Sequence, residues 1–146
     1  MPYPEEWVAP MREELTRIGV RELRSAQDVD SVLAGEKGTV LVVINSICGC
    51  AAGRARPAIA DALKAEPRPD VLTTVFAGQD LDATTKAREY FLPYPPSSPS
   101  IALLRDGKLV FMMERHSIES REAPEISRDL QEAFARYCSQ EAPASP

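Results

Sequence analysis

The chain contains the stretch Thr39-Val-Leu-Val-Val-Ile44 followed by Asn45-Ser-Ile-Cys48-Gly-Cys50. The first six residues are apolar or β-branched, which is typical of a buried central strand. The next segment, Ala51 to Leu63, has the pattern of a helix, and Pro57 is predicted to kink it. Two cysteines therefore stand where a strand passes into a helix. Unpaired backbone N–H groups at a helix N-terminus favour a thiolate, which is the form that attacks a disulfide. The sequence thus indicates thiol–disulfide chemistry.

Composition limits the classes of protein that the chain can belong to. Its 146 residues are 44% hydrophobic and 27% charged, with a net charge of −5, which is typical of a globular domain and gives no sign of a nucleic-acid or anionic-membrane partner. No apolar run approaches the roughly 18 residues of a membrane helix, and the acidic start Met1 to Trp7 does not resemble a signal peptide. We expect a cytoplasmic protein with one domain over residues 1–138 and a flexible tail at 139–146.

The order of the other elements predicts the fold class. One apolar helical face, ended by Gly19, comes first, and Ser25 is expected to cap the next helix. An Asp106-Gly107 turn predicts a hairpin. The expected helices span about 8–18, 25–33, 51–63, 81–91 and 124–137, and the expected strands 20–23, 39–44, 71–76, 100–104 and 108–112. This order predicts an α/β protein, a thioredoxin-like mixed sheet flanked by helices with an extra N-terminal helix.

A proline supports this fold. Pro99 stands immediately before the first hairpin strand, where thioredoxin-like proteins place a cis-proline that faces the active-site cysteine. We therefore predict that the Ser98–Pro99 bond is cis, against the alternative of an ordinary trans proline that ends a loop.

The segment Asn45-Ser-Ile-Cys-Gly-Cys-Ala-Ala-Gly-Arg-Ala-Arg-Pro57 closely resembles the active-site block of the bacilliredoxin family, which has a thioredoxin-like fold. Further blocks occur in the same order: Pro10-Met-Arg-Glu-Glu-Leu15, Val75-Phe-Ala-Gly-Gln-Asp80, Pro96-Ser-Ser-Pro-Ser-Ile-Ala-Leu-Leu104 and Arg115-His116. The resemblance spans nearly the whole chain, from Val8 to Cys138.

This resemblance implies an enzyme, a thiol–disulfide oxidoreductase that removes bacillithiol from mixed disulfides on client proteins. It makes Cys48 the nucleophile and Cys50 the resolving thiol. No bound cofactor is implied, because bacillithiol or another low-molecular-weight thiol is the co-substrate, with glutathione or coenzyme A as candidates in a host without bacillithiol. Members have also been discussed as disulfide isomerases, which leaves that activity as an alternative.

Four residues are expected to support the cysteines. Gly49 would tolerate the strained ring that a disulfide between such close cysteines requires. Backbone groups of Ser98, beside Pro99, would pair with the substrate chain. Val42 occupies the position, six residues before Cys48, where thioredoxins keep a buried carboxylate, so no internal base is evident. Ser46 is a candidate neighbour for proton transfer.

Other notable residues have simpler interpretations. Arg54 and Arg56 add positive charge to the helix after the cysteines, and both are expected to be solvated surface residues. Trp7 is predicted to pack under the N-terminal helix. The lone His116 is predicted to be a surface or structural residue, and Cys138 a buried thiol.

Two rival functions use the same cysteines. A metal or iron–sulfur binder could take Cys48, Cys50, Cys138 and His116 as ligands, but a C-x-C pair without a second matched pair lacks zinc-site spacing, so no metal is expected. A redox-sensing module would oxidise the same cysteines without turnover. The oligomeric state is not predicted by any pattern in the chain.

Overall fold

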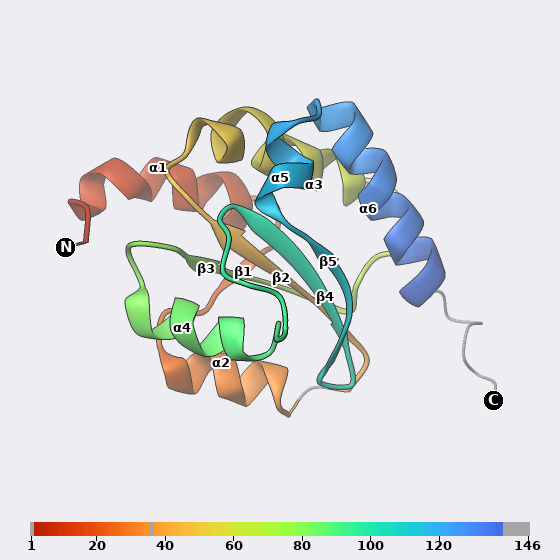
Figure 1. Ribbon diagram of the computed structural model, residues 1–146, viewed down its shortest axis with the longest axis horizontal. Helices are drawn as coiled ribbons and strands as arrows, with labels where there is room; N and C mark the ends of the chain where they lie inside the picture. Colours follow the sequence, from red (N-terminus) through yellow and green to blue (C-terminus); the bar gives the residue numbers. More distant parts are fainter. Residues whose placement is uncertain (1, 36, 139–146) are drawn as a thin grey trace.

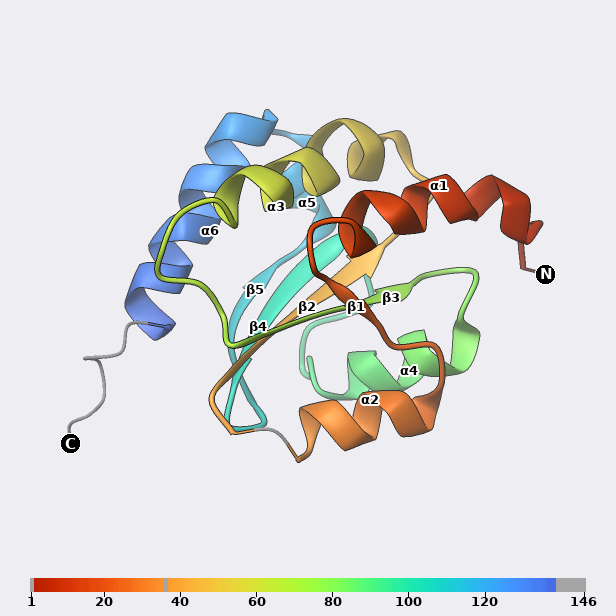
Figure 2. The same cartoon turned by 180° about the vertical axis from the view of Figure 1, so that it is seen from behind.

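The computed structural model, which describes residues 2–35 and 37–138, consists of a mixed five-stranded sheet between two layers of helices (Figures 1 and 2). The strands are β1 (Arg21–Glu22), β2 (Thr39–Asn45), β3 (Val71–Phe76), β4 (Ser100–Arg105) and β5 (Lys108–Met113). The helices are α1 (Glu5–Thr16), α2 (Ala26–Leu33), α3 (Arg56–Ala62), α4 (Leu81–Glu89), α5 (Arg115–Glu119) and α6 (Ala123–Tyr137), with a π-helical turn, η1 (Ala51–Ala55), before α3.

Strand β2 is the centre of the sheet. The strand order is β1-β3-β2-β4-β5, in which β1, β3 and β2 run parallel while β4 and β5 are antiparallel to their neighbours. All seven residues of β2 are buried, because both of its edges are paired and both of its faces are covered. Its side chains alternate, so that Leu41 and Val43 enter one hydrophobic cluster and Val40, Val42 and Ile44 the other.

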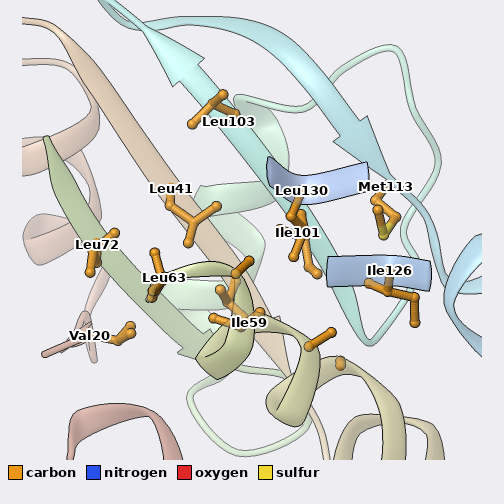
Figure 3. Packing of buried hydrophobic residues seen from close by; sticks show 14 of the residues in the cluster. Val20, Leu41, Ile59, Leu63, Leu72, Ile101, Leu103, Met113, Ile126 and Leu130 are labelled. Atoms are coloured by element: carbon orange, nitrogen blue, oxygen red, sulfur yellow. The ribbon is translucent and has the colours of Figure 1, made fainter. Parts of the chain in front are cut away.

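Each face of the sheet has its own core. The first cluster joins the sheet to α1, α3, α5 and α6. Figure 3 shows some of its buried side chains, among them Leu41 and Leu103 of the strands, Ile59 of α3 and Ile126 of α6. The second cluster joins the opposite face to α2 and α4. The views in Figures 1 and 2 agree that the two sets of helices lie on opposite sides of the sheet. The predicted fold class is therefore confirmed.

Local signals at the turns are also confirmed. Asp106 and Gly107 have φ values of 51° and 83°, the left-handed conformation that a two-residue hairpin turn requires. Ser25 caps α2, since its hydroxyl oxygen accepts a hydrogen bond of 3.0 Å from the Asp28 N–H. Gly19, with a φ of 95°, closes the turn after α1.

The helices differ from the expectations in three ways. The chain after the cysteines is not one regular helix, because η1 comes first and α3 begins at Arg56, which places Pro57 in a first turn where proline is tolerated; the kink at Pro57 stays a prediction. Helix α5 was not expected, since its five residues are too few to show a helical period. Trp7 does not pack under α1 but is 61% exposed.

Helix α1 is attached to the sheet through a buried charge. Arg12, 6% exposed, donates hydrogen bonds to Glu5, Glu22 and Asp80, the last at 2.8 and 3.0 Å from two guanidinium nitrogens. Its guanidinium also lies 5.4 Å from the centre of the Phe76 ring, within the range of a cation–π contact. These contacts tie α1 to β1 and to the segment between β3 and α4.

The tail predicted at 139–146 lies outside the described residues, and the single-domain extent of 1–138 stays a prediction. Within residues 2–35 and 37–138, no helix combines the length and the apolar character needed to span a bilayer.

Candidate active site

Cys48 lies at the entrance of the helix that follows β2, as predicted. Its carbonyl oxygen accepts hydrogen bonds from the Ala51 and Ala52 N–H groups at 2.9 and 3.2 Å, so helical bonding begins at this residue. Its sulfur accepts a hydrogen bond of 3.3 Å from the Cys50 N–H. The Cys48 side chain thus occupies the place of an N-cap acceptor, where it satisfies one of the unpaired N–H groups of the first turn.

A hydrogen-bonded loop holds Cys48 at this place. The Ser46 hydroxyl oxygen accepts from the Cys48 N–H at 3.0 Å, and the Asn45 side-chain oxygen accepts from the Ser46 N–H at 2.9 Å. One nitrogen of Arg56 donates both to the Asn45 side-chain oxygen at 2.8 Å and to the Ser46 carbonyl at 2.9 Å, while another donates to Glu14 at 2.9 Å. The Ser46 side chain therefore holds the nucleophile in place through the backbone N–H of Cys48.

The expectation that Arg56 is a solvated surface residue is wrong, since it is only 3% exposed. It is buried because α3 starts at this residue and carries it under the loop that joins β2 to Cys48. Arg54 is half-buried and donates to the Arg121 carbonyl at 2.8 Å, which ties η1 to the segment before α6. The hydrogen bonds of Arg54 and Arg56 therefore go to groups other than the two cysteine sulfurs.

The positive charge at the cysteines comes from α5, which lies against η1. One terminal nitrogen of Arg115 lies 4.0 Å from the Cys50 sulfur. The Glu119 carboxylate lies 4.0 Å from the same sulfur and accepts a hydrogen bond of 3.0 Å from Arg115 Nε. An arginine and a carboxylate, four residues apart on one helical face, are thus placed beside Cys50.

These surroundings make the two thiols unequal. Partial burial acts to raise the pKa of Cys48, but the hydrogen bonds from the Cys50 backbone and thiol and the charge of Arg115 outweigh it and lower this pKa below its ordinary value. Burial raises the pKa of Cys50, and its hydrogen bond to Cys48 and the charge of that sulfur raise it further. Of the two thiols, Cys48 is therefore the one that loses its proton more readily.

The proline loop lies beside the cysteines. The Ser98–Pro99 bond is cis, which confirms the prediction, and Pro99 is buried at the start of β4. The Ser98 carbonyl accepts a hydrogen bond of 3.2 Å from Arg115, and the Ser97 hydroxyl accepts one of 3.3 Å from the Arg115 N–H. Arg115 thus bridges this loop and Cys50. The Ser98 carbonyl, which has two lone pairs, is the group with which a substrate chain was predicted to pair. Such pairing stays a prediction.

Gly49 has no structural need to be glycine while the thiols are reduced. The three cysteines, Cys48, Cys50 and Cys138, are all free. A Cβ atom built on Gly49 would meet nothing within 4 Å, and its φ lies outside the left-handed region. A role of Gly49 in tolerating the closed disulfide ring stays a prediction about the oxidised form.

The four residues of the rival metal site are not brought together. Cys138 is half-buried at the other end of the sheet, where burial raises its pKa and the hydroxyl of Thr39, the first residue of β2, opposes the shift. His116 is exposed on α5, as expected. Among the described residues, no three His, Cys, Asp or Glu side chains gather as a possible metal site.

Arg115 and Glu119 were not predicted from the sequence as parts of the site. Arg115 appeared there only within the block Arg115-His116, and the candidate for proton transfer was Ser46, whose part in that transfer stays a prediction. One signal was present: an Arg and a Glu four residues apart directly follow the second hairpin strand. Ile101 of β4 is paired with Met113 of β5. Because the two strands are antiparallel, two residues before Ile101 and two residues after Met113 are Pro99 and Arg115, which places them opposite each other beside the cysteines.

A mixed sheet with two cysteines after its central parallel strand and a cis-proline beside them defines a thiol–disulfide protein of the thioredoxin fold. The structure is similar to that of thioredoxin from Fasciola hepatica, with a TM-score of 0.55 and 20% sequence identity, over 81% of this chain and 99% of that one. At this identity the likeness concerns the fold.

The sequence comparisons identify the family. A family model described as disulphide isomerase matches residues 3–138. A bacilliredoxin from Salinibacter ruber is 56% identical over 147 residues, which cover 99% of this chain and 86% of that protein. Another from Koribacter versatilis is 54% identical over 136 residues, which cover 93% and 94% of the two chains. The chain therefore belongs to the bacilliredoxin family, and family and fold together support a role as a thiol–disulfide oxidoreductase.

Proposed function

We propose that this protein removes bacillithiol, or a similar low-molecular-weight thiol, from mixed disulfides on client proteins. The observation that carries the proposal is the inequality of the two thiols, in which Cys48 is held as the better thiolate and Cys50 as its protonated neighbour. The names of the relatives point to the same chemistry. The reaction needs no bound cofactor, and a reducing cytoplasm would keep both thiols reduced between turnovers.

In the first step, the Cys48 thiolate attacks the sulfur of the small thiol in the mixed disulfide. A new S–S bond forms between Cys48 and the small thiol, while the client cysteine leaves as a thiolate and takes a proton from water. Hydrogen bonds to the Cys48 sulfur and the charge of Arg115 favour the attacking form. The client is thereby reduced, and the cap stays on Cys48.

In the second step, the adduct is resolved. Cys50 attacks the Cys48 sulfur, which forms the Cys48–Cys50 disulfide and releases the small thiol. A second small thiol can instead attack the cap, which releases a small-molecule disulfide and regenerates the Cys48 thiolate. Each route forms one disulfide bond for each disulfide bond that it breaks.

Disulfide isomerisation is a second candidate function, because the matching family model carries that description. It uses the same Cys48 attack but on a disulfide within the client, followed by attack of another client thiol on the adduct. An isomerase would reactivate a protein with scrambled disulfides in the Cys50→Ser variant, whereas release of the cap from Cys48 by internal resolution requires Cys50 as well.

The test uses a bacillithiol-capped model protein and the intact masses of wild type, Cys48→Ser and Cys50→Ser. We expect cap transfer to vanish only in Cys48→Ser and an adduct to accumulate in Cys50→Ser. Because the pKa of Cys48 is lowered, the transfer rate should rise with pH through a midpoint below the pKa of an ordinary cysteine. Absence of transfer in wild type would contradict the proposed function.

A further inference from the structure

Glu119 and Arg115 lie beside the resolving cysteine, and Glu119 has no part in the transfer of the cap to Cys48 as written above. The Glu119 carboxylate and the Arg115 guanidinium are each 4.0 Å from the Cys50 sulfur, on the edge of hydrogen-bond reach for sulfur. Arg115 Nε holds the carboxylate at 3.0 Å, which limits the directions in which the Glu119 side chain can turn. Both side chains are partly exposed, at 44% for Arg115 and 46% for Glu119, so water can exchange with the pair.

The resolving step has a proton problem that this pair addresses. Cys50 is protonated before the reaction, yet only its thiolate can attack the Cys48 adduct. No carboxylate stands within β2, where Val42 occupies the position of the buried acid of thioredoxins. In the described part of the chain, Glu119 is the carboxylate that touches the Cys50 sulfur.

Formation of the adduct itself prepares Cys50 for deprotonation. Before the reaction, burial and the neighbouring Cys48 sulfur hold the pKa of Cys50 up, Glu119 also raises it, and Arg115 lowers it. Once Cys48 is part of a mixed disulfide, its sulfur is uncharged and its contribution to this pKa is lost. Arg115 remains to stabilise the Cys50 thiolate as the proton leaves.

The other charged groups near this point are engaged elsewhere. Arg54 of η1 donates to the Arg121 carbonyl and pairs with Glu122 at 3.5 Å. Arg121 forms an ion pair with Asp129 of α6. The charges that face Cys50 from the elements packed around it are therefore those of Cys48, Arg115 and Glu119.

We propose that Glu119 is the catalytic proton acceptor for Cys50 in the resolving step and that Arg115 is the positioning residue that holds it there. The Cys50 S–H proton passes to the Glu119 carboxylate while the Cys50 electron pair forms the bond to the Cys48 sulfur. The bond between Cys48 and the small thiol breaks, and the small thiol leaves as a thiolate that is protonated by Glu119 or by water. The two cysteines are oxidised to a disulfide and the cap is reduced, so no further oxidant is needed.

The inference rests on the proposed function, but its test does not need a bacillithiol substrate. The probe is the aromatic disulfide 5,5′-dithiobis(2-nitrobenzoate), applied to full-length protein in a Cys138→Ser background, which leaves only the two site thiols. The first release of the coloured thiol reports attack by Cys48, and the second reports attack by Cys50 on the Cys48 adduct. Capped-client transfer, measured separately, reports the proposed function.

We expect Glu119→Gln to leave the rate of the first release within about twofold of the parent. The same change should slow the second release by roughly tenfold or more near pH 7. A general base typically contributes roughly 100-fold or more, so tenfold is the smallest loss that we expect. The deficit should disappear at alkaline pH, where hydroxide deprotonates Cys50 without help. Glu119→Asp should restore part of the second rate. Arg115→Gln should slow both releases, since Arg115 also lowers the pKa of Cys48.

The matched control is Glu132→Gln, which removes an exposed carboxylate from α6 and should change neither release. The proposal is overturned if Glu119→Gln releases the second thiol at the parental rate, or if it slows that release equally at every pH, as a merely structural ion pair would. Normal release of both thiols by wild type without cap transfer would refute the proposed function alone.

Discussion

Replacement of Arg56 by methionine tests whether a buried arginine supports the cysteine loop. The substitution keeps much of the aliphatic stem but removes the donors to the Asn45 side chain, the Ser46 carbonyl and Glu14. Hydrogen bonds to charged groups contribute about 1.5–3 kcal/mol each, and loss of one partner of a buried ion pair costs roughly 3–5 kcal/mol. Glu14 is 39% exposed and regains water, so we place the total loss near the lower end, at about 3 kcal/mol.

This loss is measurable by urea unfolding, and for a chain of this size it corresponds to a fall in Tm of roughly 6–12 °C. The control is Arg54→Met on the same helical segment, where a half-buried arginine makes one backbone hydrogen bond and one long ion pair, so about 1 kcal/mol or less is expected. If Arg56→Met and Arg54→Met lose the same stability within error, the reasoning about the buried network is refuted.

Two further changes test the packing of the sheet and the attachment of α1. Leu103→Ala removes a fully buried side chain of β4 and should cost about 2–5 kcal/mol in urea unfolding, while Leu92→Ala, at an exposed site, should stay within about 0.5 kcal/mol. Arg12→Met should lower Tm at neutral pH. Because the hydrogen bond from Arg12 lowers the pKa of Glu5, the stability that this pair adds is full above the ordinary glutamate pKa and is lost as pH falls through the lowered value. Wild type should therefore lose part of its Tm advantage over Arg12→Met as pH falls through the lowered pKa of Glu5. An advantage that is constant with pH would contradict this assignment.

Much of the fold could be predicted because its signals are local. Thr39 to Ile44 is apolar at nearly every position and rich in β-branched residues, which favours a strand covered on both faces. The Asp106-Gly107 turn and the cap at Ser25 depend on a few residues each. The place of Cys48 followed from the same strand, because the chain must leave the sheet where the apolar run ends.

The inward direction of Arg56 could not be predicted in this way. A sequence window treats 51–63 as one helix with a constant 3.6-residue period, but η1 changes the period before α3 begins. The face on which Arg56 lies therefore depends on a π-helical turn that has no sequence signature of its own. Burial of a charge is also a tertiary event, since the partners Asn45 and Glu14 are distant along the chain.

The place of Arg115 depends on a second irregularity. The pairing of β4 with β5 shifts by one residue between Leu103 and Leu104, as in a β-bulge. Without that shift, the register set by the Asp106-Gly107 turn would place Glu114 opposite Pro99. A shift of one residue moves a side chain to the other face of a sheet, so the hairpin signal alone could not bring Arg115 to the cysteines.

The residues of the site belong to two elements, β2 and α5, that differ in how readily they unfold locally. Cys48 follows β2, whose seven residues are all buried, with both edges of the strand paired. The amide hydrogens of β2 should therefore exchange with solvent only through global unfolding. Arg115 and Glu119 belong to a five-residue helix that follows the partly exposed edge strand β5, where smaller openings suffice. Brief local openings of α5 would therefore alter the reactivity of a thiol whose own position stays fixed, and hydrogen exchange would show them as two separate rates within one active site.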